Sequence, residues 1–235
     1  MIKTIEQILQ EINHQDNPYF TKLLNKEFKK DDFIETQIQF YFAVIFFSRP
    51  MAALAAKIPT AELRLEVIRN VWEEHGEGNI DSMHGNTFLI LLDRLGSIST
   101  QDIDSRALWP CVRHFNTTLI GACVLDEYLI GVGMMGMIEH MFSQISGWIG
   151  KGIIENDWIQ KDQLIHYAAH EDLDVKHSED FFNVLKKSWE KKSDRYYIEQ
   201  GLRLGAYMFN LLYDGLYQSR TTRLLVDGRS FHSRA

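Results

Sequence analysis

Proline and cysteine are both scarce in this chain of 235 residues. The four prolines are widely spaced, and no Pro/Gly/Ser-rich stretch or internal repeat divides the sequence. Because proline interrupts helices, its scarcity, together with many Leu, Ile, Glu, Lys and Gln residues, favours an all-α protein. Two cysteines, Cys111 and Cys123, are too few for a disulfide framework.

The chain also lacks an excess of positive charge and long unbroken apolar runs. Its net charge of −7 argues against a nucleic-acid partner, which needs a basic face. The longest apolar stretches, residues 40–56 and 119–138, are interrupted by charged residues and by Pro50, so we expect no membrane span. Nothing at the N-terminus resembles a signal peptide, and we expect a cytoplasmic protein.

A hydrophobic content of 45% is sufficient for one large core. We therefore predict a single helical domain over residues 1–218. Residues 219–235 contain four arginines and one aspartate, and we predict that they form a basic C-terminal tail.

The apolar pattern predicts several helices. One covers Ile2–Ile12, another begins after Pro59 with Thr60 as its cap, and the most buried one covers Thr117–Ile145. A turn is expected at residues 147–152, followed by helices over residues 158–177, 181–192 and 195–218.

Six residues in the predicted helices are candidate metal ligands. Offsets of four and seven return a side chain to the same helix face. The candidates fall into three groups, which are Glu77 with His84, then Glu139, then His170 with Asp174 and His177. Three carboxylates and three imidazoles are the donors that two adjacent iron or manganese ions need.

Each group also has a simpler explanation. Glu77 and His84 could belong to a solvated cluster, and His170, Asp174 and His177 could be part of a charged surface. Glu139 is harder to explain in this way, because a carboxylate among methionines must be paired, protonated or bound to metal. The combination with Glu139 is what favours a metal site. Gly76 and Gly78 beside Glu77 indicate a local distortion of the helix.

Motifs for other chemistries are absent from the sequence. His170-Glu171 would begin an H-E-x-x-H zinc motif, but the fifth position is Asp174. The ferritin-like pattern needs two E-x-x-H pairs, and no second pair is present. There is no G-x-S-x-G nucleophile motif.

The order Glu77-x6-His84, Glu139, His170-x3-Asp174-x2-His177 resembles the ligand pattern of the haem-oxygenase-like di-iron oxidases. The resemblance covers roughly residues 17–216. It implies a seven-helix bundle, like that of haem oxygenases and thiaminase-like proteins, in which these six residues bind two Fe(II) ions and Glu139 bridges them. Manganese is a possible replacement for iron.

The resemblance further implies an enzyme that activates O2 to oxidise or fragment a small molecule. Members of the family decarboxylate fatty acids, cleave or desaturate amino acids, form aminobenzoate, or convert brominated tryptophan to a nitrile. A pocket rich in Phe, Met and small residues suits an aromatic or aliphatic substrate, and the chain looks similar to the nitrile-forming type. We therefore expect an aromatic, tryptophan-type amino acid as substrate. An external electron donor and a homodimer are further expectations.

The substrate pocket is expected beside Glu139. Val132, Met135 and Gly136 lie one and two turns before Glu139 on its helix face. Gly136 would leave room beside the metal, although it could equally allow another helix to approach. Two other functions remain open, a metal-free thiaminase-like enzyme and an interaction protein with a vestigial site.

Overall fold

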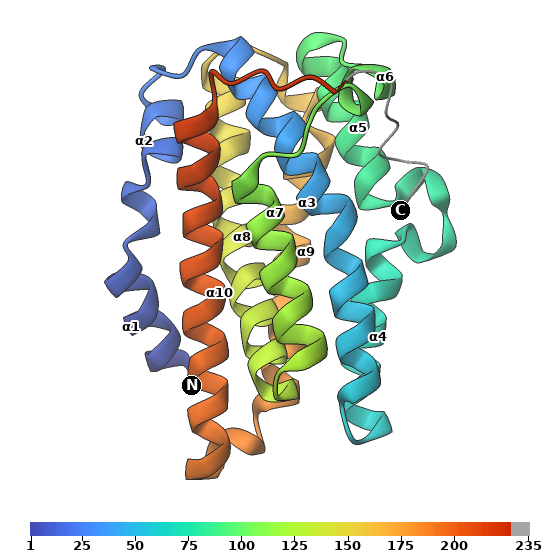
Figure 1. The fold of residues 1–235 in the computed structure, drawn as a ribbon, viewed down its shortest axis with the longest axis vertical. Coiled ribbons are helices and arrows are strands. Elements are labelled where there is room, and N and C mark those ends of the chain that lie inside the picture. Colours follow the sequence, from blue (N-terminus) through green and yellow to red (C-terminus); the bar gives the residue numbers. More distant parts are fainter. Residues whose placement is uncertain (227–235) are drawn as a thin grey trace.

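Ten α-helices form the part of the chain that this computed structural model describes, which is residues 1–226 apart from the side chains of residues 168–174. The helices run in one bundle (Figure 1). In chain order they are α1 (Ile2–Ile12), α2 (Pro18–Leu24), α3 (Lys30–Lys57), α4 (Ala61–Glu74), α5 (His84–Gly96), α6 (Thr100–Asp104), α7 (Pro110–Ile120), α8 (Tyr128–Glu155), α9 (Ile165–Leu185) and α10 (Lys192–Ser219). The all-α prediction is confirmed, with ten α-helices in place of the expected seven.

The predicted boundaries at the start and the end of α8 and within α9 are wrong. The predicted helix Thr117–Ile145 is interrupted, because α7 ends at Ile120 and α8 begins at Tyr128. α8 continues through the expected turn at residues 147–152, and α9 joins two segments that were expected to be separate helices. Gly152 serves close packing, because a Cβ there would lie 2.5 Å from Leu23 Cγ. The glycines in this stretch therefore mark a helix contact and not a turn.

α8 lies in the interior, between α9 and α10 (Figure 1). Its contact with α10 is close because Gly201 has no side chain, and a Cβ there would lie 2.3 Å from the carbonyl oxygen of Ile130. Glu139, near the middle of α8, is consequently buried between helices, with 3% of its surface exposed.

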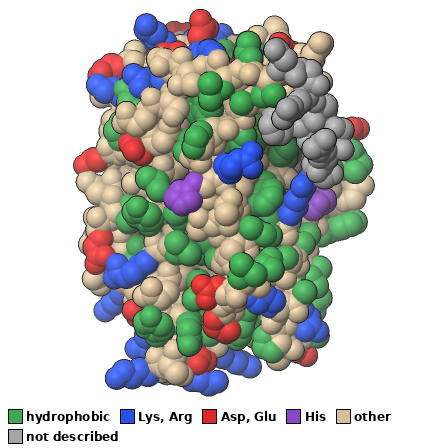
Figure 2. All heavy atoms as spheres, viewed as in Figure 1, with side chains coloured by type: hydrophobic (Ala, Val, Ile, Leu, Met, Phe, Trp, Pro, Cys, Tyr) green, Lys and Arg blue, Asp and Glu red, His purple; other side chains and the backbone are tan. Residues whose placement is uncertain are grey.

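The surface shown in Figure 2 mixes apolar, acidic and basic side chains. In the described residues, α3 is the one helix long and apolar enough to span a membrane. More than half of its most apolar window is buried inside the bundle, as in the core helix of a folded domain.

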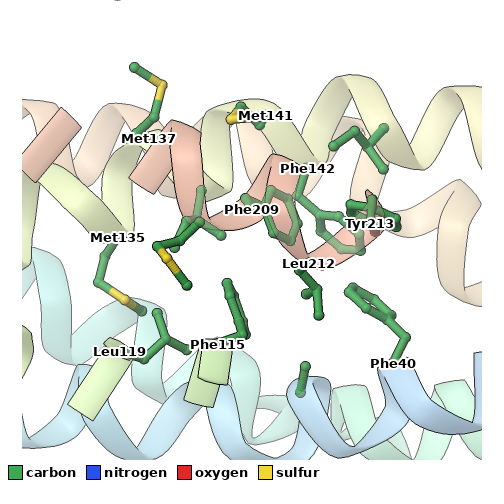
Figure 3. Close-up of a cluster of buried hydrophobic side chains, with 14 of the residues drawn as sticks. Phe40, Phe115, Leu119, Met135, Met137, Met141, Phe142, Phe209, Leu212 and Tyr213 are labelled. Atoms are coloured by element: carbon green, nitrogen blue, oxygen red, sulfur yellow. The ribbon is translucent and has the colours of Figure 1, made fainter. Parts of the chain in front are cut away.

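An aromatic cluster connects α3, α7, α8 and α10 (Figure 3). Phe142 of α8 lies between Phe40 and Phe209, with ring centroids 5.7 and 5.9 Å apart, and Phe209 packs on Phe115 at 5.8 Å. These rings form one wall of the cavity described below.

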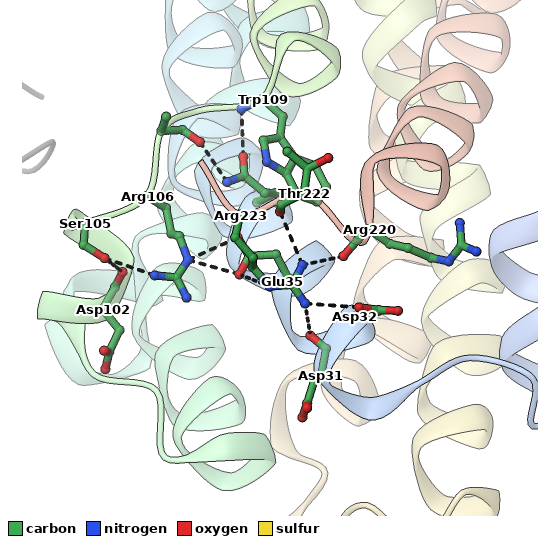
Figure 4. A network of polar contacts seen from close by, with 12 residues as sticks. Asp31, Asp32, Glu35, Asp102, Ser105, Arg106, Trp109, Arg220, Thr222 and Arg223 are labelled. Atoms are coloured by element: carbon green, nitrogen blue, oxygen red, sulfur yellow. Dashed lines mark hydrogen bonds and ion pairs between the residues drawn. The ribbon is translucent and has the colours of Figure 1, made fainter. Parts of the chain in front are cut away.

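The segment after α10 crosses the N-terminal end of α3 and reaches the chain that follows α6 (Figures 1 and 4). Backbone hydrogen bonds join Ala107 to Leu224 and Val226 to Ser105. Arg106 and Arg223 both pair with Glu35 of α3, which is 2% exposed. The first residues of the predicted basic tail are thus packed against the domain, and residues 227–235 lie outside the description.

Candidate metal centre

Three buried side chains from three helices converge in the bundle. Glu74 is the last residue of α4, Glu139 lies in α8 and His177 lies in α9. One donor atom from each lies within 4.8 Å of the donors of the other two. Two carboxylates and an imidazole at this separation can bind one divalent cation together.

His84, the first residue of α5, lies beside this group. Its Nδ1 is 2.9 Å from Glu74 Oε1, and its ring is stacked 6.4 Å from that of His177. Burial is the largest single effect and lowers the pKa of His84, but Glu74 and Glu73 together outweigh it, and the pKa is raised. Binding of a metal ion by His84 and Glu74 therefore competes with binding of a proton by this pair.

The carboxylate of Glu73 holds the His177 ring from the side that faces away from Glu139. Its Nε2 donates to Glu73 Oε2 at 2.7 Å, and Glu73 also pairs with Lys176 at 2.5 Å. The Nδ1 atom, 4.0 Å from Glu139 Oε1, faces the buried group. Burial lowers the pKa of His177, which favours the neutral imidazole that binds metals.

Glu77 does not lie with these residues. α4 ends at Glu74 with His75 as its C-cap, and Gly76, Glu77 and Gly78 then have φ values of 64°, 54° and 88°. Such positive φ values end a right-handed helix, so the seven-residue spacing from Glu77 to His84 does not describe one helix face. The expected helix through Glu77 is wrong, and the expected distortion beside the two glycines is confirmed. Glu77 is exposed on this turn.

The structure brings Glu139, His84 and His177 together as the sequence pattern suggested. His170 and Asp174 belong to the stretch of α9 whose side chains lie outside the description. The binding of metal by these five residues and by Glu77 stays a prediction.

The chain matches the family model described as iron-containing redox enzyme over residues 35–209. This match covers well over half of the chain. The chain belongs to this family of iron-containing redox enzymes. A comparison with curated proteins finds no match.

Solved structures share the fold of this family member. A CADD-like protein of unknown function from Nostoc punctiforme superimposes with a TM-score of 0.77 at 15% identity, covering 94% of this chain and 97% of that one. A Shewanella denitrificans domain of unknown function with a heme oxygenase-like fold gives 0.73 at 13% identity, over 94% and 90%. A TenA homologue from P. horikoshii gives 0.71 at 12% identity, over 92% and 95%. The haem-oxygenase-like fold is thereby confirmed.

The donors present in this family member suit iron. Ferrous iron takes imidazole and carboxylate ligands, and the buried group supplies both in a space of one ion's size. Glu73 fixes the tautomer of His177, as carboxylates do for metal-binding histidines elsewhere. The described residues therefore fit one iron directly, with His84 beside it.

A cavity opens beside the donors. Its volume is about 40 Å³, which holds a small number of water molecules. The described residues that line it are Phe40, Ala43, Val44, Phe47, Glu74, His84, Phe115, Ile138, Glu139, Phe142, His166 and Phe209.

The three residues that were expected to border the substrate pocket do not line this cavity. Val132 and Met135 are fully buried in helix contacts and do not line this cavity. A Cβ at Gly136 would lie 2.9 Å from Phe181 Cβ, so Gly136 allows α9 to approach α8. The cavity instead follows α8 in the other direction from Glu139, towards Phe142.

Sequence reasoning missed Glu73, Glu74 and His166. In the structure, Glu73 and Glu74 follow the buried Asn70 at offsets of three and four and share its side of α4, but the sequence does not show that Asn70 is buried. A buried polar residue at that spacing indicates that this face of α4 meets another polar face. His166 lies four residues before His170, so the helical spacing already places it on the face of the H-x3-D-x2-H pattern, and that signal was overlooked.

Proposed function

We propose that this protein is a non-haem di-iron oxidase that uses O2 to oxidise a small, amino-acid-like molecule. The observation that supports the proposal most is the convergence of Glu74, Glu139 and His177 beside an apolar cavity. The family match supports iron and redox chemistry, and the two-ion site and the use of O2 go beyond it.

The chain's own side chains have distinct parts in this proposal. Glu74, Glu139, His84 and His177 would bind iron, and the resemblance adds His170 and Asp174. Bound iron would supply the reaction with O2 and the removal of electrons from the substrate. Glu73 would hold the His177 ring so that Nδ1 faces the metal.

The cavity walls would keep water away from the reacting groups. Phe40, Phe115, Phe142 and Phe209 line the cavity together with Glu74 and Glu139. Water exclusion strengthens the electrostatic interactions of the donors and protects the oxidant from side reactions.

Such walls suit an apolar or aromatic substrate, and we propose an aromatic, tryptophan-type amino acid that is converted to a nitrile. A cavity of about 40 Å³ is too small for it, so side chains must move aside when it enters. Fatty-acid or other amino-acid oxidation on the same metal site would fit the same walls. An external electron donor would reduce the iron between turnovers.

A thiaminase-like reaction through a cysteine nucleophile does not suit this chain. Burial raises the pKa of Cys111 to about 11 and that of Cys123 to about 12, so neither forms a thiolate at neutral pH. Neither cysteine lines the cavity. The TenA homologues share the fold with this chain, and their low identity carries no further conclusion.

Oxygen uptake tests the proposal. Protein loaded anaerobically with Fe(II) is mixed with O2 and a panel of amino acids and fatty acids, with mass spectrometry of the products. We expect uptake that depends on both iron and an aromatic amino acid, and its loss in Glu139→Ala. Iron-independent activity, or iron binding without O2 uptake on any compound, would contradict the proposal.

A further inference from the structure

A row of exposed apolar side chains runs along the outer face of α4. This helix lies at the edge of the bundle and packs on α3 and α9 (Figure 1), with Glu74 among its buried residues. At about 100° per residue, the row lies on the opposite side of the helix from these buried residues. We call it the α4 stripe, and it consists of Ala61, Leu65, Ile68 and Trp72. Leu65, Ile68 and Trp72 are 58, 48 and 54% exposed, and apolar side chains gathered in this way mark a site of interaction.

The spacing of the α4 stripe is that of a coiled-coil seam. Its members are separated by four, three and four residues. In the heptad repeat this order alternates between the two core positions, d and a, beginning with Ala61 at d. Such a seam is stabilised when a second helix packs on it. Among the described residues no helix does so, because the large side chains of the stripe are about half exposed.

The α4 stripe is complementary to a second copy of itself that runs in the opposite direction. When two helices pack antiparallel, each residue at an a position lies beside a d position of the partner helix. Ala61 would then lie beside the partner's Trp72, and Leu65 would lie beside the partner's Ile68. Twofold symmetry repeats both contacts. The smallest member faces the largest and two side chains of equal size face each other, so the two surfaces can interdigitate.

The charges beside the stripe favour the antiparallel arrangement. Glu62 and Arg69 occupy the exposed e positions next to the seam. In an antiparallel pair the e positions of the two helices face each other, so each Glu62 would meet the partner's Arg69. In a parallel pair an e position faces a g position, which would bring Arg69 beside the partner's Arg64, and these like charges repel. Arg69 lies 2.9 Å from Glu66 and 3.7 Å from Asp180 of its own chain, yet it is 46% exposed and a guanidinium has several N–H donors.

We propose that this chain forms a homodimer through the α4 stripe, in which α4 packs antiparallel against α4 of a second copy about a twofold axis beside residues 66 and 67. Because the surface pairs with itself, assembly ends at two chains. One short helix from each chain is a small interface, so the dissociation constant is expected in the micromolar range. The pairing uses the outer face of α4, whereas Glu74 lies on its inner face, so the inference does not depend on the proposed function.

Sedimentation velocity of the full chain, at concentrations from about 1 to 200 µM, measures the dimer. Ile68→Glu places a charge in the centre of the stripe and should raise the dissociation constant at least about tenfold. Tyr207→Glu introduces the same charge at a residue of α10 that is 55% exposed, and should keep the wild-type constant. Circular dichroism and thermal unfolding check that both variants fold. Wild type that stays monomeric, or a dimer that Ile68→Glu leaves intact, would overturn the inference.

Charge exchange tests the direction of the two helices. Glu62→Arg and Arg69→Glu should each weaken the dimer several-fold, because each variant places like charges opposite one another at both ends of the interface. The double variant should regain most of the wild-type affinity. Arg69→Glu also changes the contacts of this residue within its own chain, and Glu62→Arg gives the same test without that effect. A stronger dimer in Arg69→Glu, or a double variant as weak as the single ones, would overturn the antiparallel arrangement.

Discussion

At the scale of single residues, the main surprise is which glutamate reaches the buried group. Glu74 and Glu77 are close in sequence, yet Glu74 lies 2.9 Å from His84 and Glu77 is exposed on a turn with positive φ values. The sequence pattern identified Glu139 and His177 because helices α8 and α9 are regular around them. Gly76 and Gly78 indicated a distortion beside Glu77, but the sequence did not show that α4 already ends at Glu74.

Removing the carboxylate of Glu74 and that of Glu77 in separate variants tests which glutamate binds the metal. Glu74→Gln should lower the iron content after anaerobic Fe(II) loading, because it removes a buried oxygen donor. Glu77→Gln is the matched control and should keep the wild-type iron content. The opposite outcome would show that the turn at residues 76–78 rearranges when metal binds and that Glu77 is the ligand, as the resemblance implied.

Metal binding should also depend on pH through His84. Its pKa is raised by Glu74 against the effect of burial, and an imidazolium cannot bind a metal. Affinity for Mn(II) should therefore fall on acidification through that raised pKa, by up to about tenfold per pH unit for one displaced proton. Calorimetry in buffers of different ionisation enthalpy counts the protons released. Binding that is independent of pH between 6 and 8 would argue against His84 as a ligand.

At the scale of helices, much of the fold could be predicted. α1 begins and ends at the predicted residues because its apolar face is regular, and the side chain of Thr60 accepts from Leu63 N at the start of α4. Predictions failed where a glycine allows close helix packing and does not form a turn, as at Gly152. The sequence does not show which neighbouring residue approaches such a glycine. The α4–α9 contact was missed for a similar reason, because its residues are polar.

That contact contains a carboxyl pair. Asp180 of α9 is 7% exposed, accepts from Asn70 Nδ2 at 3.1 Å and neighbours Glu66 of α4. Burial, followed by Glu66, raises the pKa of Asp180 to about 6. A pKa raised in the folded state means that protonation stabilises the fold, that this contribution is complete below about pH 4, and that it is lost as the pH rises through 6.

Asp180→Asn should therefore stabilise the protein at pH 8, by on the order of 1–2 kcal/mol, and change little at pH 4. Urea unfolding at both pH values measures the difference. Glu179→Gln removes an exposed carboxylate from the same helix and serves as the control. A variant that is less stable than wild type at pH 8 would contradict the role given to the carboxyl pair.

At the scale of the whole molecule, the chain after α10 joins distant parts of the bundle. Arg106 Nε donates to both oxygens of the buried Glu35 at 3.1 and 3.0 Å, while Arg223 Nε lies 3.4 Å from one of them and is about one-third exposed (Figure 4). The sequence predicted a basic end to the chain and could not show that its first residues pack, because the partner lies nearly two hundred residues earlier.

These two arginines should differ in their effect on stability. Arg106→Met leaves a buried carboxylate with its main partner removed and should lower the free energy of unfolding by about 3 kcal/mol. Arg223→Met should cost about 1 kcal/mol or less, since its pair is longer and partly solvated. Adding Glu35→Gln should recover part of the loss in Arg106→Met. Equal losses of unfolding free energy in the two single variants would show that Arg106 and Arg223 contribute equally to pairing with Glu35.

The proposed iron site depends on helices α4, α5, α8 and α9 bringing their oxygen and nitrogen donors together. The most direct measurement is the iron content per chain after anaerobic Fe(II) loading and removal of unbound metal, in wild type and in Glu139→Ala of matched helicity. We expect about two irons per wild-type chain and a large loss in the variant. A folded wild-type chain that retains no iron, or a variant that retains the wild-type content, would contradict the account.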